Sequence, residues 1–506
     1  MLQNNMADRG RASKDVWFGG WLPFRAFRCG HGLERLVLVA LLASSFALGV
    51  QRWEKVYGTS WEDEADDVSQ TEDRGYVFTG TTHGPEGYNA WLVKMDSLGD
   101  TLWSRILVRR GGGQTSGLSC IPTRDKGYIV AGHYWANTTP DTMCIYLAKT
   151  DSSGDTMWTS VCSGKIGVAY DIEQTFDGGY IVAGKEDDSV AWDAVALKFD
   201  SSGALVWRRR YGREGNDVAN AVQQLADGGF ILAGFTYPSE DCQAWLIRTD
   251  SVGDTLWERF YGLPVYDDAF TSVRAMPDGG FAAAGGTSSD GNAEFYLVRT
   301  DANGDTLWTR HYGGQGTDYC SDMWTTFDGG FALTGETFSF GSGANDAWLV
   351  KTDSAGWMEW SRTFGGGDWD DAFAVQQTAD SGYVIAGMTM SYGVGGNDAY
   401  LVKTDELGLV AVTEYNRGSV GRCQGSVPLL SVTLLDDMKY FLPRPGRVRI
   451  QLYDASGRRC ARQVSGSQPA GWHEVRFDSL PHAGSYFVEL DTGKERVFSK
   501  LTVLPR

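Results

Sequence analysis

The stretch DGGFILAGFTYPSEDCQAWLIRTDSVGDTLW, residues 227–257, contains the pattern that decides the fold. Its opening Asp-Gly-Gly is typical of a tight turn that needs a positive φ, and Asp250-Ser-Val-Gly253 is typical of a second hairpin turn. Short apolar runs lie between these turns. Together with the residues just before them, they predict four strands, at 220–225, 230–233, 244–248 and 255–260.

The same unit recurs seven times along the chain. The pattern Asp-x-Gly-aromatic begins every 50–52 residues, at Asp73, Asp125, Asp177, Asp227, Asp278, Asp328 and Asp380. A basic residue follows each of them, at Lys94, Lys149, Lys198, Arg248, Arg299, Lys351 and Lys403. Seven four-stranded units of about 50 residues predict an all-β fold, a seven-bladed β-propeller spanning residues 50–415.

A repeated tryptophan marks the fourth strand of the units. It occurs at positions 103, 158, 207, 257, 308 and 360, with Trp53 ahead of the first unit and a degraded copy at 408–415. One terminal copy must close the ring, and we expect the better preserved Trp53 strand to complete the seventh blade. Residues that recur in every blade serve the blade itself, so we expect these tryptophans to pack between blades. The basic residues and the aspartates near them are expected to form turns and ion pairs.

Variation between the units falls in two sets of connections. The basic residue and the following Trp are always nine residues apart, whereas the connections between the second and third strands and between blades differ in length. Because strands alternate in direction, both variable sets lie on one face, where loop-borne function is expected. We call it the variable-loop face, and the opposite one the invariant-turn face.

Unrepeated aromatic and acidic residues on the variable-loop face form the predicted ligand-binding set. Its members are Trp61, Tyr134, Trp135, Tyr266, Asp267, Asp268, Trp369, Asp370 and Asp371. Aromatic rings beside carboxylates favour a sugar-binding surface. The alternative is that these side chains only hold their own loops. Clustered Asp oxygens are suitable ligands for Ca²⁺, so calcium binding is an alternative. No DxDxDG loop occurs, however, and neither a metal site nor a cofactor is predicted.

Composition narrows the function classes. The 506 residues carry a net charge of −19, and 65 are Gly and 19 are Trp. So many aromatic residues exclude a disordered or collagen-like chain. Residues 50–415 carry −28, residues 1–49 carry +3, and both 416–430 and 431–506 are basic. The acidic propeller argues against nucleic acid as a partner.

The amino-terminal residues 1–49 are predicted to be a leader with a signal peptide. The apolar run at 36–48 is too short to span a bilayer comfortably and is typical of a secretory h-region, with cleavage expected before Val50. An uncleaved membrane anchor is the alternative. Export would permit disulfides, but most of the cysteines are expected to be small apolar core residues.

The carboxyl-terminal residues 431–506 are a separate module, joined by a linker at 416–430. FLPRPGRVRIQLYDASGRRC, QPAGWHEVRF and LPHAGSYFVEL resemble the C-terminal sorting domains of type IX secretion and the immunoglobulin-like fold of flagellar hook-capping proteins. The resemblance implies a small β-sandwich, recognition by an outer-membrane export machine, and a secreted or cell-surface bacterial protein. An accessory β-sandwich is the alternative.

The propeller units have resemblances of their own. RTDANGDTLW at 299–308 resembles the tryptophan-docking repeats of quinoprotein-type propellers. Those enzymes have a quinone cofactor, typically eight blades and a pair of adjacent cysteines. This chain has seven units and no adjacent cysteines, so the resemblance supports the propeller fold but not a quinone cofactor. The hairpins also resemble sialidase Asp-boxes, but Asp and Gly here are separated by two residues instead of one.

No catalytic motif stands out. The sequence has no nucleophile elbow, HExxH, P-loop or dinucleotide fingerprint. We therefore expect a non-catalytic module that binds a glycan or a protein. The alternative is a carbohydrate-active hydrolase or lyase, which would need two carboxyl groups about 5–10 Å apart in a deep pocket.

Overall fold

The computed structural model describes most of residues 51–410 and much of 429–503. The gaps before residue 410 are 86, 109–112, 137–141, 163–165, 188–190, 214, 238–241, 263–266 and 289–290. The described carboxyl-terminal residues are 429–432, 438–442, 445–454, 459–469, 471–475, 484–491 and 496–503.

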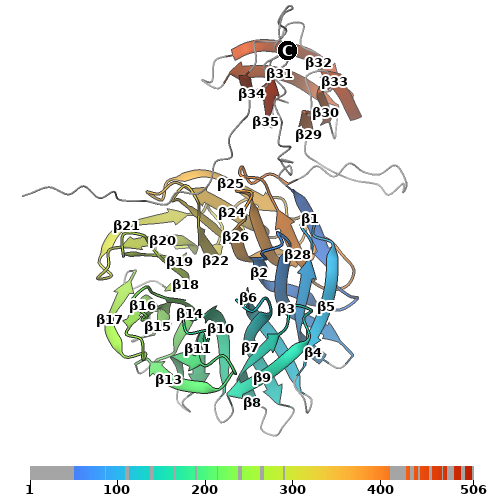
Figure 1. Cartoon of the computed structure of the whole chain (residues 1–506). Helices are drawn as coiled ribbons and strands as arrows, with labels where there is room; N and C mark the ends of the chain where they lie inside the picture. Colours follow the sequence, from blue (N-terminus) through green and yellow to red (C-terminus); the bar gives the residue numbers. More distant parts are fainter. Residues whose placement is uncertain are drawn as a thin grey trace, which may run out of the picture. The chain divides into compact units, whose positions relative to one another are not determined.

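Seven four-stranded antiparallel sheets form a ring, as Figure 1 shows, which confirms the predicted all-β, seven-bladed propeller. Blade one contains β2 (Asp63–Gln70), β3 (Tyr76–Gly84), β4 (Gly87–Met95) and β5 (Thr101–Leu107). Blade two contains β6 (Gln114–Pro122), β7 (Tyr128–Ala136), β8 (Thr142–Thr150) and β9 (Thr156–Cys162). Blade three contains β10 (Gly167–Gln174), β11 (Tyr180–Asp187), β12 (Trp192–Phe199) and β13 (Leu205–Tyr211). Blade four contains β14 (Asp217–Gln224), β15 (Phe230–Thr236), β16 (Gln243–Thr249) and β17 (Thr255–Tyr261).

The remaining blades follow the same order, with one exception at the end. Blade five contains β18 (Asp268–Ala275), β19 (Phe281–Thr287), β20 (Glu294–Thr300) and β21 (Thr306–Tyr312). Blade six contains β22 (Asp318–Thr325), β23 (Phe331–Thr337), β24 (Asp346–Thr352) and β25 (Met358–Phe364). Blade seven contains β26 (Asp370–Gln377), β27 (Tyr383–Thr389), β28 (Asp398–Lys403) and, from the start of the described chain, β1 (Trp53–Tyr57).

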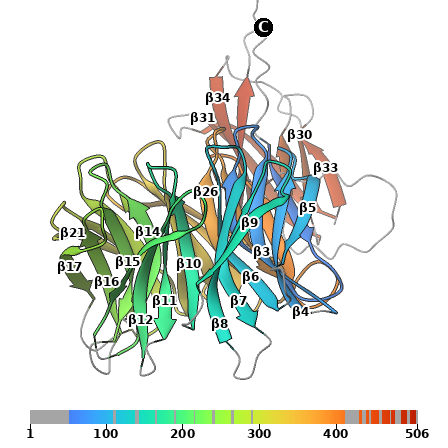
Figure 2. The ribbon, with the colours of Figure 1, turned by 60° about the horizontal axis from the view of Figure 1, so that its bottom comes forward.

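Ring closure is non-covalent. β1 pairs antiparallel with β28, and Trp53 lies opposite Lys403. The prediction that the Trp53 strand completes blade seven is therefore confirmed. Figure 2 shows the strands from another angle, running between two sets of connections.

The repeated Asp and basic residues form one element in every blade. The basic side chain is nearly buried and pairs with the Asp of the preceding turn, as in the 2.9 Å contact between Lys149 Nζ and Asp125 Oδ2. The same Asp accepts the backbone N–H of Gly127 at 3.1 Å. The residue between this Asp and the following Gly has a positive φ in every blade. It is a glycine in four blades, as such an angle favours, and Arg74, Lys126 or Ser381 in the other three.

The repeated tryptophans pack between blades, as predicted. The centre of the Trp207 ring lies 5.8 Å from the centre of the Phe230 ring in the next blade. A Cβ built on Gly253 would lie 2.9 Å from the Trp207 ring, so only Gly allows the indole to approach this closely. Each blade therefore lies against a turn of the next one.

All seven innermost strands carry a β-bulge at the same position. The register of each inner strand against its neighbour skips one residue, as between Ala65 and Asp67 in blade one. The skipped residues are Asp66, Leu118, Tyr170, Asn220, Thr271, Ser321 and Phe373. A bulge re-aims its side chain, and all seven line a cavity on the axis of the ring.

The carboxyl-terminal strands form two antiparallel sheets. The first contains β29 (Leu429–Val432), β30 (Met438–Leu442) and β33 (Gly471–Val475). The second contains β31 (Gly446–Asp454), β32 (Arg459–Gln468), β34 (Gly484–Asp491) and β35 (Arg496–Val503). The sorting-domain resemblance stays a prediction.

Other predictions fall partly outside the described residues. The leader 1–49 and linker residues 416–428 lie there entirely. Within the described ranges, no helix has the length and hydrophobicity to cross a membrane. Five described cysteines, Cys120, Cys144, Cys162, Cys242 and Cys320, are buried, in keeping with their expected role in the core.

Candidate functional site

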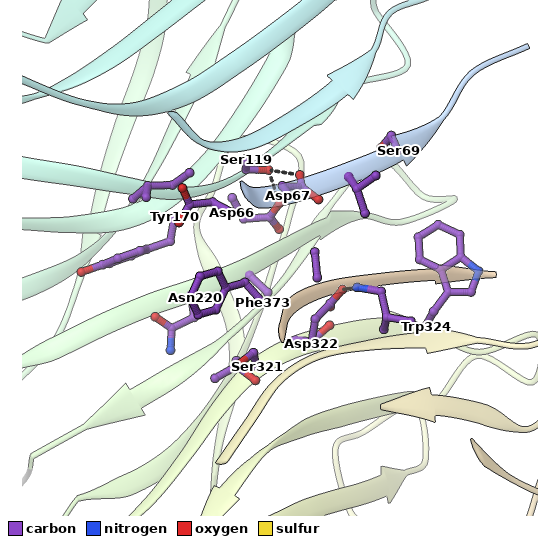
Figure 3. Close-up of a pocket in the computed structure, with 18 of the residues that line it drawn as sticks. Asp66, Asp67, Ser69, Ser119, Tyr170, Asn220, Ser321, Asp322, Trp324 and Phe373 are labelled. Carbon is purple, nitrogen blue, oxygen red and sulfur yellow. Dashed lines mark hydrogen bonds between the residues drawn. The ribbon is translucent and has the colours of Figure 1, made fainter. Parts of the chain in front are cut away.

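The axial cavity has a volume of about 200 Å³ and is lined by the inner strands of all seven blades. Figure 3 shows several of its lining side chains, among them Asp66, Tyr170, Asn220 and Phe373. The bulge residues form its first ring. One is acidic, two are aromatic, and no two are the same, which distinguishes them from the repeated residues around them.

A second ring, one residue further along each inner strand, contains three aspartates that join neighbouring blades. Asp67 Oδ2 accepts the N–H of Cys120 at 2.8 Å, and Asp171 Oδ2 accepts the N–H of Val222 at 2.8 Å. Asp322 Oδ2 accepts a backbone N–H of blade seven at 3.1 Å. These carboxylates therefore have a structural role between blades.

The cavity has more acidic than basic groups. It is lined by Asp66, Asp67, Asp171 and Asp322 but by only one basic residue, Arg274. The guanidinium of Arg274 lies 3.7 Å from Asp322 Oδ1 and 5.2 Å from the centre of the Trp324 ring. Asp66 lacks such a partner. Its Oδ2 is buried without a hydrogen-bond partner among the described residues, and burial raises its pKa well above the usual value.

An exposed aromatic patch lies on the variable-loop face, over blades six, seven and one. It contains Trp61, Phe338, Phe340, Trp369 and Tyr392, which are 41–46% exposed. The rings of Phe338 and Trp369 pack edge to face, with their centres 5.8 Å apart. The loop at residues 390–397 joins the two ends of this aromatic patch. At its start, the Met390 N–H donates to the Trp369 carbonyl. At its end, the Asn397 carbonyl accepts from the N–H of Asp63, which is two residues from Trp61.

Two carboxyl groups lie in contact near this aromatic patch. Asn345 Nδ2 donates to Glu336 Oε2 at 2.5 Å and also to Asp371 Oδ1. Burial, reinforced by the charge of Asp371, raises the pKa of Glu336 to about 7. The two carboxyl groups also interact directly with each other, so they are closer together than the roughly 5 Å of the retaining glycosidase arrangement.

The structure spreads the sequence-predicted residues over one face instead of gathering them in one pocket. Trp61, Trp135 and Trp369 are exposed, and so is Asp267, whose Oδ1 accepts the N–H of Cys242 at 3.2 Å. Only Trp61 and Trp369 belong to the aromatic patch. Tyr266 lies outside the described residues.

The other predicted residues are buried. Tyr134, Asp268, Asp370 and Asp371 are 0–9% exposed. Asp370 Oδ2 accepts the N–H of Gly366 at 2.7 Å and the hydroxyl of Ser391 at 2.6 Å, so it holds two loops together. For Asp370 the structural alternative, that it holds its own loops, fits the geometry.

The axial residues were missed by the sequence-based reasoning, although a signal for them exists. Every bulge residue lies seven positions before the Asp of its turn, as Asp66 does before Asp73. At that fixed offset the residue type changes in every unit. A position with constant spacing but varying chemistry is where a repeat protein departs from its own symmetry.

Stability should be greatest near pH 4. Burial raises the pKa of Asp67, Glu173 and Glu336 to about 7, against about 4 in an unfolded chain. Their stabilising contribution is complete below pH 4 and is lost as the pH rises through 7. Asp177 and Asp328, with pKa values of about 2, lose their contribution as the pH falls below 4.

Thermal unfolding followed by circular dichroism at pH 2, 4 and 8 checks this pH dependence. The midpoint at pH 4 should exceed both others, and Glu336→Gln should reduce the difference between pH 4 and pH 8. A midpoint that rises from pH 4 to pH 8 would contradict the assignment.

A larger groove of about 640 Å³ lies between blades one and two on the invariant-turn face. Its lining includes Asp73, Lys94, Trp103 and Tyr128, all members of the repeated pattern. Because the other units carry equivalents of these residues, the groove belongs to the packing between blades. It is a weaker candidate for a specific site.

Comparison with known proteins identifies no family for this chain. No protein-family model and no curated protein sequence matches the chain. Among solved structures, the polysaccharide lyase Uly1 is 11% identical with a TM-score of 0.48, covering 69% of this chain and 91% of its own. A PL25 ulvan lyase bound to -[GlcA(1-4)Rha3S]- is 10% identical with a TM-score of 0.44, covering 69% and 96%. Sqt1 from Chaetomium thermophilum is 11% identical with a TM-score of 0.42, covering 66% and 82%.

Proposed function

We propose that this protein is a non-catalytic binding module that holds a glycan on the aromatic patch. The observation that carries the proposal is the group of five exposed aromatic side chains at neighbouring loops of one face. Soluble proteins seldom expose such a patch unless it binds something. An aromatic ring offers an apolar face at low conformational cost, which suits the C–H faces of a sugar ring.

A carboxylate beside the aromatic patch supports a polar ligand over a purely apolar one. Glu62 Oε2 accepts the hydroxyl of Tyr88 at 2.9 Å next to Trp61. Such oxygens accept hydrogen bonds from sugar hydroxyls. The Glu336 and Asp371 carboxyls are in contact, so this pair does not have the spacing that a glycosidase needs.

Export to the cell surface or beyond is part of the proposal. The apolar run at 36–48 and the motifs of 431–506 support it, with the outer-membrane export machinery as the partner of the carboxyl-terminal module.

Replacing both Trp61 and Trp369 with Ala should weaken glycan binding about thirtyfold. Loss of two stacking indoles removes roughly 2 kcal/mol of binding free energy. A glycan array with the labelled full chain identifies the ligand, and isothermal titration calorimetry measures its affinity for each variant.

Trp357→Ala is the matched control, because this indole is 63% exposed and lies in a turn on the invariant-turn face. It should leave binding unchanged. Equal affinity of the double variant and the native chain would overturn the proposed surface. Failure of every glycan to bind would favour a protein as the ligand.

A further inference from the structure

The bulge ring combines one acidic side chain, Asp66, with several neutral oxygen atoms that can accept hydrogen bonds. Asn220 Nδ2 already donates to Phe270 O at 2.8 Å. Thr271 Oγ1 donates to carbonyl oxygens of neighbouring strands at 3.2 Å. The oxygens of Asn220, Thr271, Tyr170 and Ser321 can all accept hydrogen bonds. A ligand that carries N–H donors therefore suits this ring.

Asp66 provides the charge for such a ligand. Its Oδ2 is buried without a partner among the described residues, and the one basic residue of the cavity, Arg274, is engaged by Asp322. In blade order Asp66 stands between Leu118 and Phe373. A free carboxylate oxygen between an aliphatic and an aromatic side chain suits an organic cation with a short apolar stem.

A metal ion fits these residues less well. Among the described residues no group of three or more His, Cys, Asp or Glu side chains converges as a metal site. Asp67, Asp171 and Asp322 each have an oxygen committed to a backbone N–H. The cavity volume of about 200 Å³ is below the range of drug-sized pockets, so it accommodates a small ligand or one end of a longer one.

We propose that the axial cavity binds a primary ammonium group carried on a short alkyl chain, with Asp66 as its counter-ion. Three N–H donors of the ammonium meet Asp66 and the neutral oxygens of the bulge ring, and the alkyl chain lies against Leu118 and Phe373. This site is separate from the aromatic patch, so its failure would leave the proposed glycan binding untouched.

Isothermal titration calorimetry on the full chain at pH 8 tests the site, with n-butylammonium and 1,4-diaminobutane as probes. Both should bind saturably, whereas n-butanol, which has the same shape without the charge, should not. Asp66→Asn should weaken amine binding by about tenfold to a hundredfold, the contribution of one charge-assisted hydrogen bond. Glu72→Gln, an exposed residue in a turn of the same blade, should leave binding unchanged.

Leu118→Lys provides a second, independent variant. Its own ammonium should occupy the ring beside Asp66, so the folded variant should no longer bind either amine. Unaltered amine binding by Asp66→Asn or by Leu118→Lys would overturn the proposal, as would the absence of saturable binding to the native chain. Calcium chloride that binds saturably and displaces butylammonium would also overturn it, in favour of a metal site.

Discussion

Trp53→Ala is expected to lower the free energy of unfolding by about 3–5 kcal/mol, the usual cost of removing a buried indole. Trp53 is 7% exposed, and its ring lies 5.5 Å from Tyr76 of blade one. Its Nε1 donates to Ser97 O at 3.1 Å. Because Trp53 belongs to the strand that closes blade seven, this single side chain stabilises both that blade and its contact with blade one.

Trp207→Ala is the matched comparison for ring closure. Trp207 makes the equivalent contact with the next blade at 5.8 Å, but its strand follows β12 directly along the chain. Urea unfolding should show the smaller loss for Trp207→Ala. Limited proteolysis should cut the connection at residues 58–62 in Trp53→Ala alone. Equal losses and equal cleavage would show that ring closure is no weaker than the other contacts between blades.

Asp125→Ala is expected to lower the free energy of unfolding by about 3 kcal/mol, since it leaves an ammonium group buried without its counter-ion. The Lys149 side chain is only 3% exposed, and besides Asp125 its Nζ donates to Thr150 O at 2.7 Å. Asp125 also accepts the hydroxyl of Thr123 at 2.5 Å, so the turn loses a second contact. Urea unfolding measures the loss.

Two further variants separate charge from packing. Lys149→Met removes the buried charge itself and leaves an aspartate that water can reach, so its cost should be about 1 kcal/mol. The double variant should resemble Lys149→Met. Asp155→Ala, which breaks an exposed contact with Arg105 at 3.1 Å, should cost less than about 0.5 kcal/mol. A larger loss for Lys149→Met than for Asp125→Ala would contradict this account.

The fold could be predicted because its determinants recur. One Asp-x-Gly-aromatic turn says little, but seven of them at spacings of 50–52 residues require seven equivalent units. The same logic predicted that Trp53 would complete blade seven, since the last unit lacks its own Trp. The ion pairs were predicted only in part, because Lys94 pairs with Asp73 of the preceding turn and not with Asp96, two residues away.

The candidate sites were harder to predict, because they depend on where side chains point. A β-bulge turns Asp66 towards the axis, and no residue pattern in the inner strand shows that an extra residue has been inserted. Glu336 and Asp371 are 35 positions apart in sequence and meet only because two blades are neighbours. Burial of Asp370 likewise follows from the loops it binds, which its sequence neighbours do not reveal.

The pairing of β1 with β28 also sets where the ring could be labelled or immobilised. Trp53 lies opposite Lys403, so the described chain enters and leaves the ring at one corner, on the invariant-turn face. Trp61 and Trp369 lie at the opposite ends of the blades. A tether attached at Arg52, which is exposed, would therefore leave the aromatic patch open to a ligand.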